Sequence, residues 1–251
     1  MKDIERNEWM IVALWGSSGS GKSSLSVQIA LALSRKKHNV VLVDTNFVVP
    51  QCGIWFPDMA ATQQHSLSTI LENEITPEGL AGRIHLVNRR LGVLGYTMGE
   101  LAMNSLIQRY DTAASLLHIA ATLSDYVIVD CQTNITQDHL TFTALEMSGR
   151  KIIIHTPDMR GISFRLSNVT MLADSKYNME NAIQVLNKVR TISPVDSIER
   201  VIGNINYTLP FDHRVYRALC EGESGKLSGY DMSKPYSRVF DSLINNITSD
   251  K

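Results

Sequence analysis

Eight consecutive residues, Gly16 to Ser23, combine glycines, small hydroxyl residues and one lysine in an order that can bind phosphate. They read GSSGSGKS and match the pattern G-x-x-x-x-G-K-[ST]. Glycines let successive backbone N–H groups converge on phosphate oxygens, and a helix beginning near Lys22 adds its positive dipole end. We expect Lys22 to reach the β and γ phosphates of a nucleotide and the Ser23 hydroxyl to ligate Mg²⁺. The predicted phosphate-binding residues are Gly16, Ser17, Ser18, Gly19, Ser20, Gly21, Lys22, Ser23 and Ser24.

Two aspartates stand where a bound Mg²⁺ ion would need a carboxylate. Asp44 follows the apolar run VVLV at 40–43, and Asp130 follows YVIV at 126–129. Because the carboxyl ends of parallel strands meet at one edge of a sheet, both aspartates should lie beside the phosphate loop. We therefore predict Ser23, Asp44 and Asp130 as metal ligands. A turn or helix N-cap aspartate remains the alternative for each carboxylate.

Short apolar runs that alternate with helical patterns must position these residues. The run at 9–15 stops at Gly16, which is typical of a strand buried on both faces of a parallel sheet. Helical periodicity marks 24–34 and 112–123. Further strands are expected at 40–43, 84–87, 126–129, 152–154, 183–186 and 205–209, with 91–94 as an additional candidate. The alternation predicts an α/β fold: a doubly wound, mostly parallel sheet of about seven strands with helices on both faces.

No glycine- or proline-rich linker divides the chain, so we expect a single domain over residues 1–251 that closes with an amphipathic helix at about 234–248. Its apolar stripe could pack on the core, form a dimer surface or lie on a membrane, and its few lysines disfavour anionic lipid. The loop at 47–66 carries Trp55 and Phe56. We interpret it as either a partner or dimer surface or a lid packed on the domain.

Composition indicates a globular protein without a strong electrostatic field. Twenty-four Lys and Arg residues balance 25 Asp and Glu residues, for a net charge of −1. DNA binding is not expected, because the only basic clusters, 35–37 and 89–90, are typical of solvated helix ends and turns. Three cysteines lack metal or disulfide spacing, the N-terminal residues are acidic, and no apolar run could span a membrane. We expect a cytoplasmic protein with at most indirect membrane contact.

Beyond the phosphate loop, several segments resemble the MinD/ParA group of ATPases. They are VVLVDTN at 40–46 (switch I), YVIVDCQTN at 126–134 (switch II), KIIIHTPD at 151–158, VLNK at 185–188 and LPFDHRVYRALCEGESG at 209–225. The resemblance implies ATP and Mg²⁺ as ligands, a homodimer that can depend on nucleotide, and protein partners in a larger assembly. It also implies that Asn187 reads the adenine edge and that Pro210 and Asp212 lie near the base. Within the group the chain looks most similar to the CpaE/TadZ pilus and secretion localisation proteins.

Three departures from the group's pattern bear on catalysis. Ser17 stands where members carry a signature lysine that reaches the partner's nucleotide, Asn46 replaces the second switch I aspartate, and Gln132 or Thr133 replaces the switch II proline. An asparagine amide can hold a water but cannot accept its proton. The expected catalytic set is Lys22, Asp44, Asn46 and Asp130, in an ATPase that is slow at most.

The leading interpretation is a nucleotide-dependent switch for spatial positioning or assembly of a cellular machine, such as a pilus or secretion apparatus, division or partition. A bacterial tyrosine-kinase-like phosphotransferase is an alternative, although the C-terminal segment holds only Tyr230 and Tyr236. A signal-recognition-type GTPase would select guanine through an aspartate in a T-K-x-D context, and this chain reads NKVR at 187–190 without that aspartate. A scaffold that binds no nucleotide is disfavoured by the intact Lys22–Ser23 pair.

Overall fold

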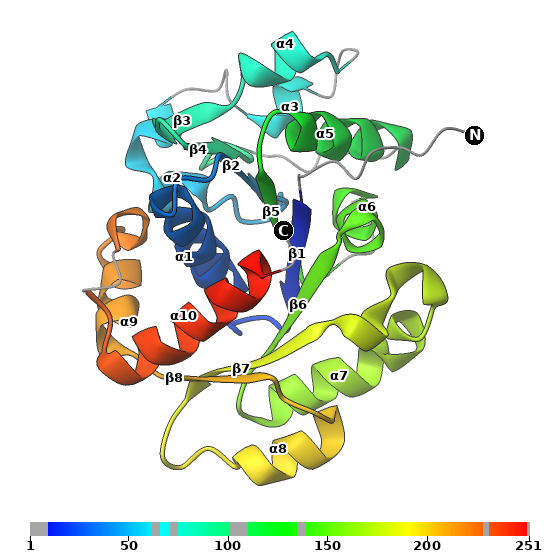
Figure 1. The fold of residues 1–251 in the computed structure, drawn as a ribbon, viewed down its shortest axis with the longest axis vertical. Helices are drawn as coiled ribbons and strands as arrows, with labels where there is room; N and C mark the ends of the chain where they lie inside the picture. Colours follow the sequence, from blue (N-terminus) through cyan, green and yellow to red (C-terminus); the bar gives the residue numbers. More distant parts are fainter. Residues whose placement is uncertain are drawn as a thin grey trace.

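A computed structural model describes residues 10–61, 66–70, 75–100, 110–134, 139–227 and 231–249. Its centre is an eight-stranded sheet with strand order β3-β4-β2-β5-β1-β6-β7-β8 (Figure 1). All neighbouring strands run parallel except β3 and β4. The strands are β1 (Met10–Gly16), β2 (Val40–Asp44), β3 (His85–Asn88), β4 (Leu91–Leu94), β5 (Tyr126–Asp130), β6 (Arg150–His155), β7 (Ile183–Val189) and β8 (Tyr207–Pro210).

Helices cover both faces of this sheet. One face packs against α1, α9 and α10, and the other against α5, α6 and α7 (Figure 1). The helices are α1 (Lys22–Arg35), α2 (Cys52–Trp55), α3 (Leu67–Ile70), α4 (Pro77–Ala81), α5 (Tyr110–Thr122), α6 (His139–Met147), α7 (Met159–Leu172), α8 (Val195–Ile202), α9 (His213–Cys220) and α10 (Lys234–Thr248). The central strands β2 and β5 are buried along their whole length, as the continuous apolar runs in the sequence predicted.

The predicted α/β fold is confirmed, with eight strands rather than about seven. The additional strand comes from the β3–β4 hairpin, where both apolar runs form strands. β3 is the antiparallel edge strand, and its residues alternate between intermediate burial and exposure, as expected of a strand with one solvated side. The last strand begins at Tyr207 rather than at residue 205.

The aromatic side chains that follow β2 are buried, so the expectation that they form a partner surface is wrong. Trp55 and Phe56 are each 5% exposed. They belong to the same core cluster as α1 and α10. Gly225 lies so close that a Cβ there would come within 2.1 Å of the Trp55 carbonyl oxygen. The packed-lid alternative is therefore correct for these residues, while 62–65 lie outside the described residues.

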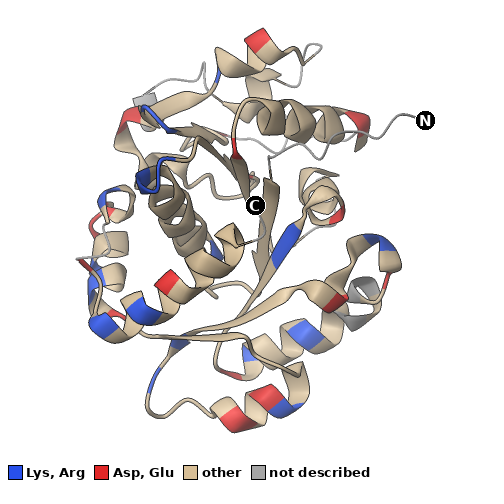
Figure 2. Cartoon of the chain, in the orientation of Figure 1, with Lys and Arg blue, Asp and Glu red and all other residues tan. Residues whose placement is uncertain are grey.

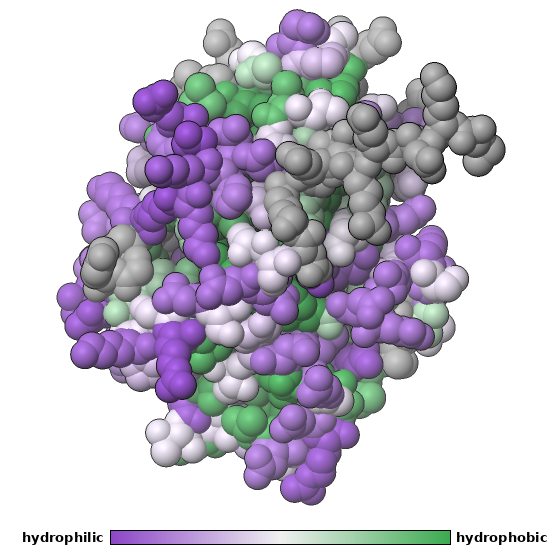
Figure 3. Space-filling model, viewed as in Figure 1, coloured by the Kyte–Doolittle hydropathy of each residue, from purple (hydrophilic) through white to green (hydrophobic). Residues whose placement is uncertain are grey.

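The amphipathic helix expected near 234–248 is α10, and its apolar side packs on the core. Phe240, Leu243, Ile244 and Ile247 are buried there. The Tyr236 hydroxyl donates a hydrogen bond to Gln28 Oε1 of α1 at 2.8 Å. Hydrophilic side chains predominate where α10 meets solvent (Figure 3). In the described part of the chain, no helix is long and apolar enough to cross a membrane.

The two basic clusters of the sequence meet at the amino edge of the sheet. Arg90, in the β3–β4 turn, donates from Nη1 to the Lys37 carbonyl oxygen at 2.6 Å, just past the end of α1. Figure 2 shows basic residues side by side at this edge. Because the phosphate loop follows β1 at the opposite, carboxyl edge, these clusters do not contribute to the phosphate-binding site.

Candidate nucleotide-binding site

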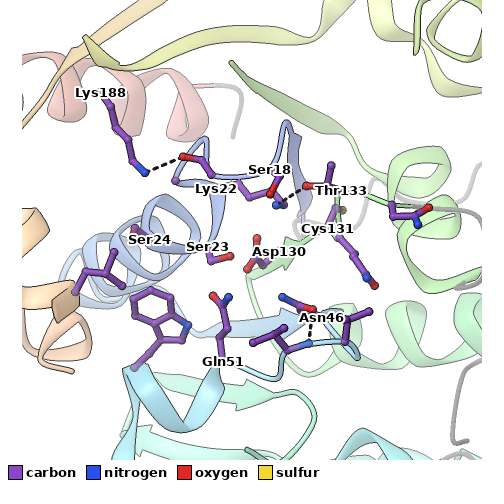
Figure 4. A pocket seen from close by; sticks show the side chains of 18 residues that line it. Ser18, Lys22, Ser23, Ser24, Asn46, Gln51, Asp130, Cys131, Thr133 and Lys188 are labelled. Carbon is purple, nitrogen blue, oxygen red and sulfur yellow. Dashed lines mark hydrogen bonds between the residues drawn. The ribbon is translucent and has the colours of Figure 1, made fainter. Parts of the chain in front are cut away.

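A pocket of about 630 Å³ opens at the carboxyl edge of the sheet over the phosphate loop (residues 16–23) (Figure 4). The β2 loop (residues 45–51) and the β5 loop (residues 131–134) form its other walls. The lining residues are Ser18, Gly19, Gly21, Lys22, Ser23, Ser24, Asn46, Val48, Val49, Gln51, Trp55, Asp130, Cys131, Gln132, Thr133, Asn134, Lys188 and Leu219. The sheet order β2-β5-β1 brings these three loops together.

The backbone of the phosphate loop explains its glycines. Gly19 and Gly21 have φ values of 73° and 86°, in the left-handed region that favours glycine. A Cβ on Gly16 would lie 2.1 Å from the Ile154 carbonyl oxygen. α1 begins at Lys22 with no side-chain cap on its N-terminal N–H groups. Free N–H groups at a helix N-terminus form an anion site, so the local geometry suits phosphate.

Lys22 is held by the β5 loop. Its Nζ donates to Thr133 Oγ1 at 2.8 Å, and the same hydroxyl donates to the Gly16 carbonyl oxygen at 2.9 Å. Figure 4 shows the Lys22 and Thr133 side chains meeting across the pocket. Thr133 thus connects the lysine, the start of the phosphate loop and the β5 loop.

Asp130 and Ser23 form an oxygen site beside Lys22. Asp130 is 5% exposed, and its Oδ1 is buried without a hydrogen-bond partner among the described residues. Burial raises the pKa of Asp130, while the charge of Lys22 and the nearby hydroxyls of Ser23 and Ser26 act against that shift. A buried carboxylate oxygen with spare bonding capacity next to a serine hydroxyl fits Mg²⁺, which prefers hard oxygen ligands.

Asp44 lies next to Asp130 in the sheet register but does not line the pocket. Its Oδ1 accepts a hydrogen bond from the Asn46 N–H at 2.9 Å, and Oδ2 accepts from the Gln51 N–H and the Cys52 thiol. Burial, with the neighbouring Asp130, raises the pKa of Asp44 to about 7. In this conformation Asp44 organises the β2 loop, and its metal-binding role stays a prediction.

Asn46 does reach the pocket. Its Oδ1 accepts a hydrogen bond from the Val49 N–H at 3.0 Å, and its side chain faces the phosphate loop across the cavity (Figure 4). Val48 and Val49 beside it are 57% and 56% exposed. The position suits contact with a water near the terminal phosphate, and the catalytic role of Asn46 stays a prediction.

One buried hydroxyl joins the β2 loop to the β5 loop. Thr45 Oγ1 accepts a hydrogen bond from the Gln132 N–H at 2.9 Å and contacts Thr141 Oγ1 of α6 at the same distance. Thr45 also donates its own N–H to the Asp130 carbonyl oxygen at 3.1 Å. A displacement of either loop must therefore change hydrogen bonds that the other loop makes.

Three residues expected near a base line a second cavity of only about 30 Å³: Asn187, Pro210 and Asp212. This volume is too small for a purine, since it holds no more than a few waters. Asp212 caps α9, accepting from the N–H groups of Arg214 and Val215, and its second oxygen accepts from the Ser233 N–H. These bonds lower the pKa of Asp212 despite its burial. The structure gathers the three residues around this small cavity, which shares Gly21, Ser24, Lys188 and Leu219 with the larger pocket, and their role near a base stays a prediction.

Sequence reasoning gave no role in the site to Thr45, Gln51, Thr133 or Lys188, and the last three of these line the pocket. Thr133 was noticed only as a replacement for the switch II proline. Its contact with Lys22 joins positions 111 residues apart, and no local pattern encodes such a pairing. Lys188 Nζ donates to the Gly19 carbonyl oxygen at 2.8 Å, again from a distant strand.

A family model described as the CobQ/CobB/MinD/ParA nucleotide binding domain matches residues 11–225. The chain belongs to this family. It is 24% identical over 272 residues to the cytosolic Fe-S cluster assembly factor Nubp2 homolog of Aedes aegypti, covering 99% of each protein. The resemblance to MinD/ParA ATPases is thereby confirmed, and the narrower similarity to CpaE/TadZ proteins stays a prediction.

Solved structures of the MinD/ParA family share the fold. A ParA family ATPase from Chlorobium tepidum TLS superposes with a TM-score of 0.75 at 21% identity, over 94% of this chain and 98% of that one. The septum site-determining protein MinD from Pyrococcus horikoshii OT3, complexed with Mg-ADP, gives 0.73 at 14% identity over 96% of both chains. At these identities the likeness establishes the common fold alone.

Proposed function

We propose that this chain is an ATP-binding molecular switch of the MinD/ParA type, which serves the spatial positioning or assembly of a larger cellular machine. The observation that carries the proposal is the Lys22–Thr133 hydrogen bond at 2.8 Å. Lys22, which would contact the phosphates, is held by Thr133 of the β5 loop, and a bound nucleotide would have to displace this loop. Nucleotide binding and displacement of the β5 loop are therefore coupled in this proposal.

ATP with Mg²⁺ is the ligand that the proposal requires. Lys22 and the N-terminal N–H groups of α1 would hold the phosphates. The Ser23 hydroxyl and the partnerless Oδ1 of Asp130 would hold Mg²⁺, which neutralises phosphate charge when bound. The MinD structure with Mg-ADP supports this assignment by analogy. For Asp44 to join the metal site, it would have to release hydrogen bonds within the β2 loop.

The switching step follows from competition for Lys22. A charged phosphate oxygen forms a stronger hydrogen bond with Lys22 than the neutral Thr133 hydroxyl does. Once displaced from Lys22, Thr133 keeps the bond of its hydroxyl to the Gly16 carbonyl oxygen and the bond that its own carbonyl oxygen accepts from Trp15 Nε1, so the β5 loop loses one of its links to the phosphate loop. The Gln132–Thr45 hydrogen bond passes the resulting movement of the β5 loop to the β2 loop. Both loops then present a different surface at the pocket mouth.

Hydrolysis in this proposal is slow at most. Among the described residues that line the pocket, Asp130 is the single carboxylate, and it is engaged as the proposed Mg²⁺ ligand. Asn46 can hold a water by hydrogen bonds, but its amide cannot take the proton of an attacking water. The site therefore has parts for binding but lacks a free general base.

A nucleotide-dependent homodimer and protein partners complete the proposal. Val48 and Val49 support it, because exposed apolar side chains on a loop beside the pocket offer a contact whose position depends on the ligand. A role in pilus or secretion assembly is the narrowest form of the proposal. A cytoplasmic location, with membrane recruitment only through partners, belongs to the same proposal.

Hydrogen exchange with Mg·ATP, with Mg·ADP and without nucleotide tests the switch. We expect both nucleotides to protect residues 16–24, and ATP alone to change exchange in the β2 and β5 loops. Lys22→Ala should weaken ATP binding by about 10- to 100-fold, which corresponds to about 1.5–3 kcal/mol for hydrogen bonds to a charged group. Identical exchange in all three states would refute the switch, and unchanged affinity in Lys22→Ala would refute the site.

A further inference from the structure

A cavity of about 310 Å³ lies beside the β3–β4 hairpin, at the amino edge of the sheet. Residues that directly precede β2, β4 and β5 line it, together with residues of β3 and of the ends of α4 and α5. None of these residues also lines the pocket over the phosphate loop, which is at the carboxyl edge. The proposed switch therefore gives this cavity no role.

A glycine in β4 shapes the floor of the cavity. Gly92 lies opposite Leu86 of β3 and Val41 of β2 in the sheet register. A Cβ on Gly92 would come within 2.2 Å of Ile84 Cγ2 and 3.8 Å of Leu86 Cδ2. Because Gly92 has no side chain, Ile84 and Leu86 lie directly over the β4 backbone, and the floor of the cavity is apolar.

Two leucines extend this apolar surface to solvent. Leu86 is 71% exposed, and Leu123, which follows α5, is 40% exposed. Both line the cavity. Figure 3 shows hydrophobic surface over β3, next to a group of hydrophilic side chains. Single exposed apolar residues are common, but two at one cavity form a surface that an apolar group of a partner can cover.

The charge at the cavity is positive. Among the described residues that line it, Arg89 and Arg90 are charged and none is acidic. Arg90 Nη1 donates to the Lys37 carbonyl oxygen at 2.6 Å and to Asn39 Oδ1 at 3.3 Å, which fixes the guanidinium at the rim. The Arg89 side chain makes no hydrogen bond or ion pair with another described residue. Asp125, just beyond the lining residues, already accepts the Asn39 N–H at 2.7 Å.

We propose that this cavity is a docking site for a protein segment in which an apolar side chain is flanked by carboxylates. The apolar side chain would enter the cavity, whose volume of about 310 Å³ lies near the lower limit of roughly 300–1,000 Å³ for ligand pockets. The carboxylates would pair with Arg89 and with the free side of the Arg90 guanidinium, where bidentate hydrogen bonds can form.

The arrangement favours a protein segment over a small anion or a lipid surface. A small anion would pair with the arginines but would leave Leu86 and Leu123 exposed to water. A lipid surface is bound by apolar side chains that project from the face of a helix, whereas these residues line a cavity. An apolar anchor in a pocket with polar groups at its rim is typical of protein interfaces. The site is at the edge opposite the phosphate loop, so it does not depend on the proposed switch.

Selection from a phage library of random dodecapeptides on immobilised wild-type protein tests this proposal. Selected peptides should carry acidic residues on both sides of a leucine, isoleucine or phenylalanine. Labelled synthetic copies are then titrated and followed by fluorescence anisotropy. Arg89→Glu should weaken binding about tenfold or more, because an attractive charge becomes repulsive. Leu86→Ser should weaken it about three- to tenfold through lost apolar contact. Affinity for wild type should fall as salt is raised.

Arg200→Glu and Val201→Ser are the matched controls. They change an exposed arginine and a partly exposed apolar residue of α8, at the other end of the sheet, and should bind the peptides as wild type does. Thermal unfolding midpoints show whether each variant folds, and Arg89→Glu and Leu86→Ser each serve if the other does not.

Selected peptides without acidic residues, or acidic peptides that both cavity variants bind with wild-type affinity, would overturn the proposal. A selection that yields no binding peptide would overturn it as well. Phosphatidylserine vesicles form a separate arm of the experiment, with phosphatidylcholine vesicles for comparison. Binding to phosphatidylserine vesicles that Arg89→Glu abolishes, without any selected peptide, would show that the cavity recognises lipid instead.

Discussion

Lys22 donates a hydrogen bond to a neutral partner. Its Nζ contacts Thr133 Oγ1 at 2.8 Å, in a pocket where the carboxylate of Asp130 also lies. A phosphate oxygen adds the attraction between opposite charges, which the neutral Thr133 hydroxyl does not supply. Thr133 therefore holds Lys22 in place, and in the proposed switch we expect a phosphate to displace it.

Removing that competitor should tighten nucleotide binding. In Thr133→Val, Lys22 loses its neutral partner, so we expect ATP affinity to rise by about three- to tenfold, matching about 0.5–1.5 kcal/mol for one hydrogen bond. Calorimetric titration with Mg·ATP measures the change. Thr122→Val on the exposed side of α5 is the control, because its hydroxyl bonds only a local carbonyl. Equal or weaker binding by Thr133→Val would contradict the competition.

Asp44 should give the free energy of unfolding a distinct pH dependence. Burial and Asp130 raise its folded-state pKa to about 7 from an ordinary 3.8. Between these values the folded protein binds a proton that the unfolded chain releases, so this group's contribution to stability falls as pH rises from about 4 to 7. Asp44→Asn removes the titration, and the variant's stability relative to wild type should improve from pH 5 to pH 8.

Urea denaturation of both proteins at the two pH values measures this difference. Asp196→Asn on exposed α8 is the control and should keep a constant difference from wild type. A difference between Asp44→Asn and wild type that stays constant, or moves the other way, would show that Asp44 is ionised in the folded state.

Single-residue chemistry could be predicted from sequence only where a local motif encodes it. Lys22, Ser23 and Asp130 converge as the phosphate-loop pattern and the strand end indicated. Thr133 and Lys188 could not be found, because their roles depend on a long-range hydrogen bond and on an irregular strand. Local patterns carry neither kind of information.

At the scale of elements, continuous apolar runs identified the central strands because those strands are buried on both faces. The short helices after β2 were not predicted. Trp55 and Phe56 gave a pattern compatible with exposure or burial, and their burial depends on Gly225, nearly 170 residues later in the chain. Burial that depends on packing against distant residues cannot be predicted from the local sequence pattern.

The C-terminal helix offers a test of packing at this scale. Leu243 of α10 is fully buried, so Leu243→Ala should lower the free energy of unfolding by about 2–5 kcal/mol through lost burial and a residual cavity. The exposed Asp241→Ala on the same helix should change it by no more than about 0.5 kcal/mol. Thermal or chemical denaturation measures both. Equal stability of the two variants would mean that α10 does not complete the core in solution.

At the scale of the molecule, the sheet order makes one site from three distant loops. Because β5 lies between β2 and β1, Asp130 of β5 has Asp44 of β2 on one side and Leu14 of β1 on the other. The ligand-binding loop and both neighbouring loops then share hydrogen bonds through Thr133 and Thr45. The fold thus connects the three loops through hydrogen bonds, and the proposed switch depends on these connections.

A single-turnover experiment tests most directly the proposal of an ATP-bound switch with slow hydrolysis. Excess protein is mixed with trace labelled ATP and Mg²⁺, and both retained label and released phosphate are followed over time, with Lys22→Ala as the control. We predict that wild type retains ATP and releases phosphate far more slowly than it binds, while Lys22→Ala retains little label. Phosphate release as fast as binding, or no retention by wild type, would contradict an ATP-bound switch without a free general base.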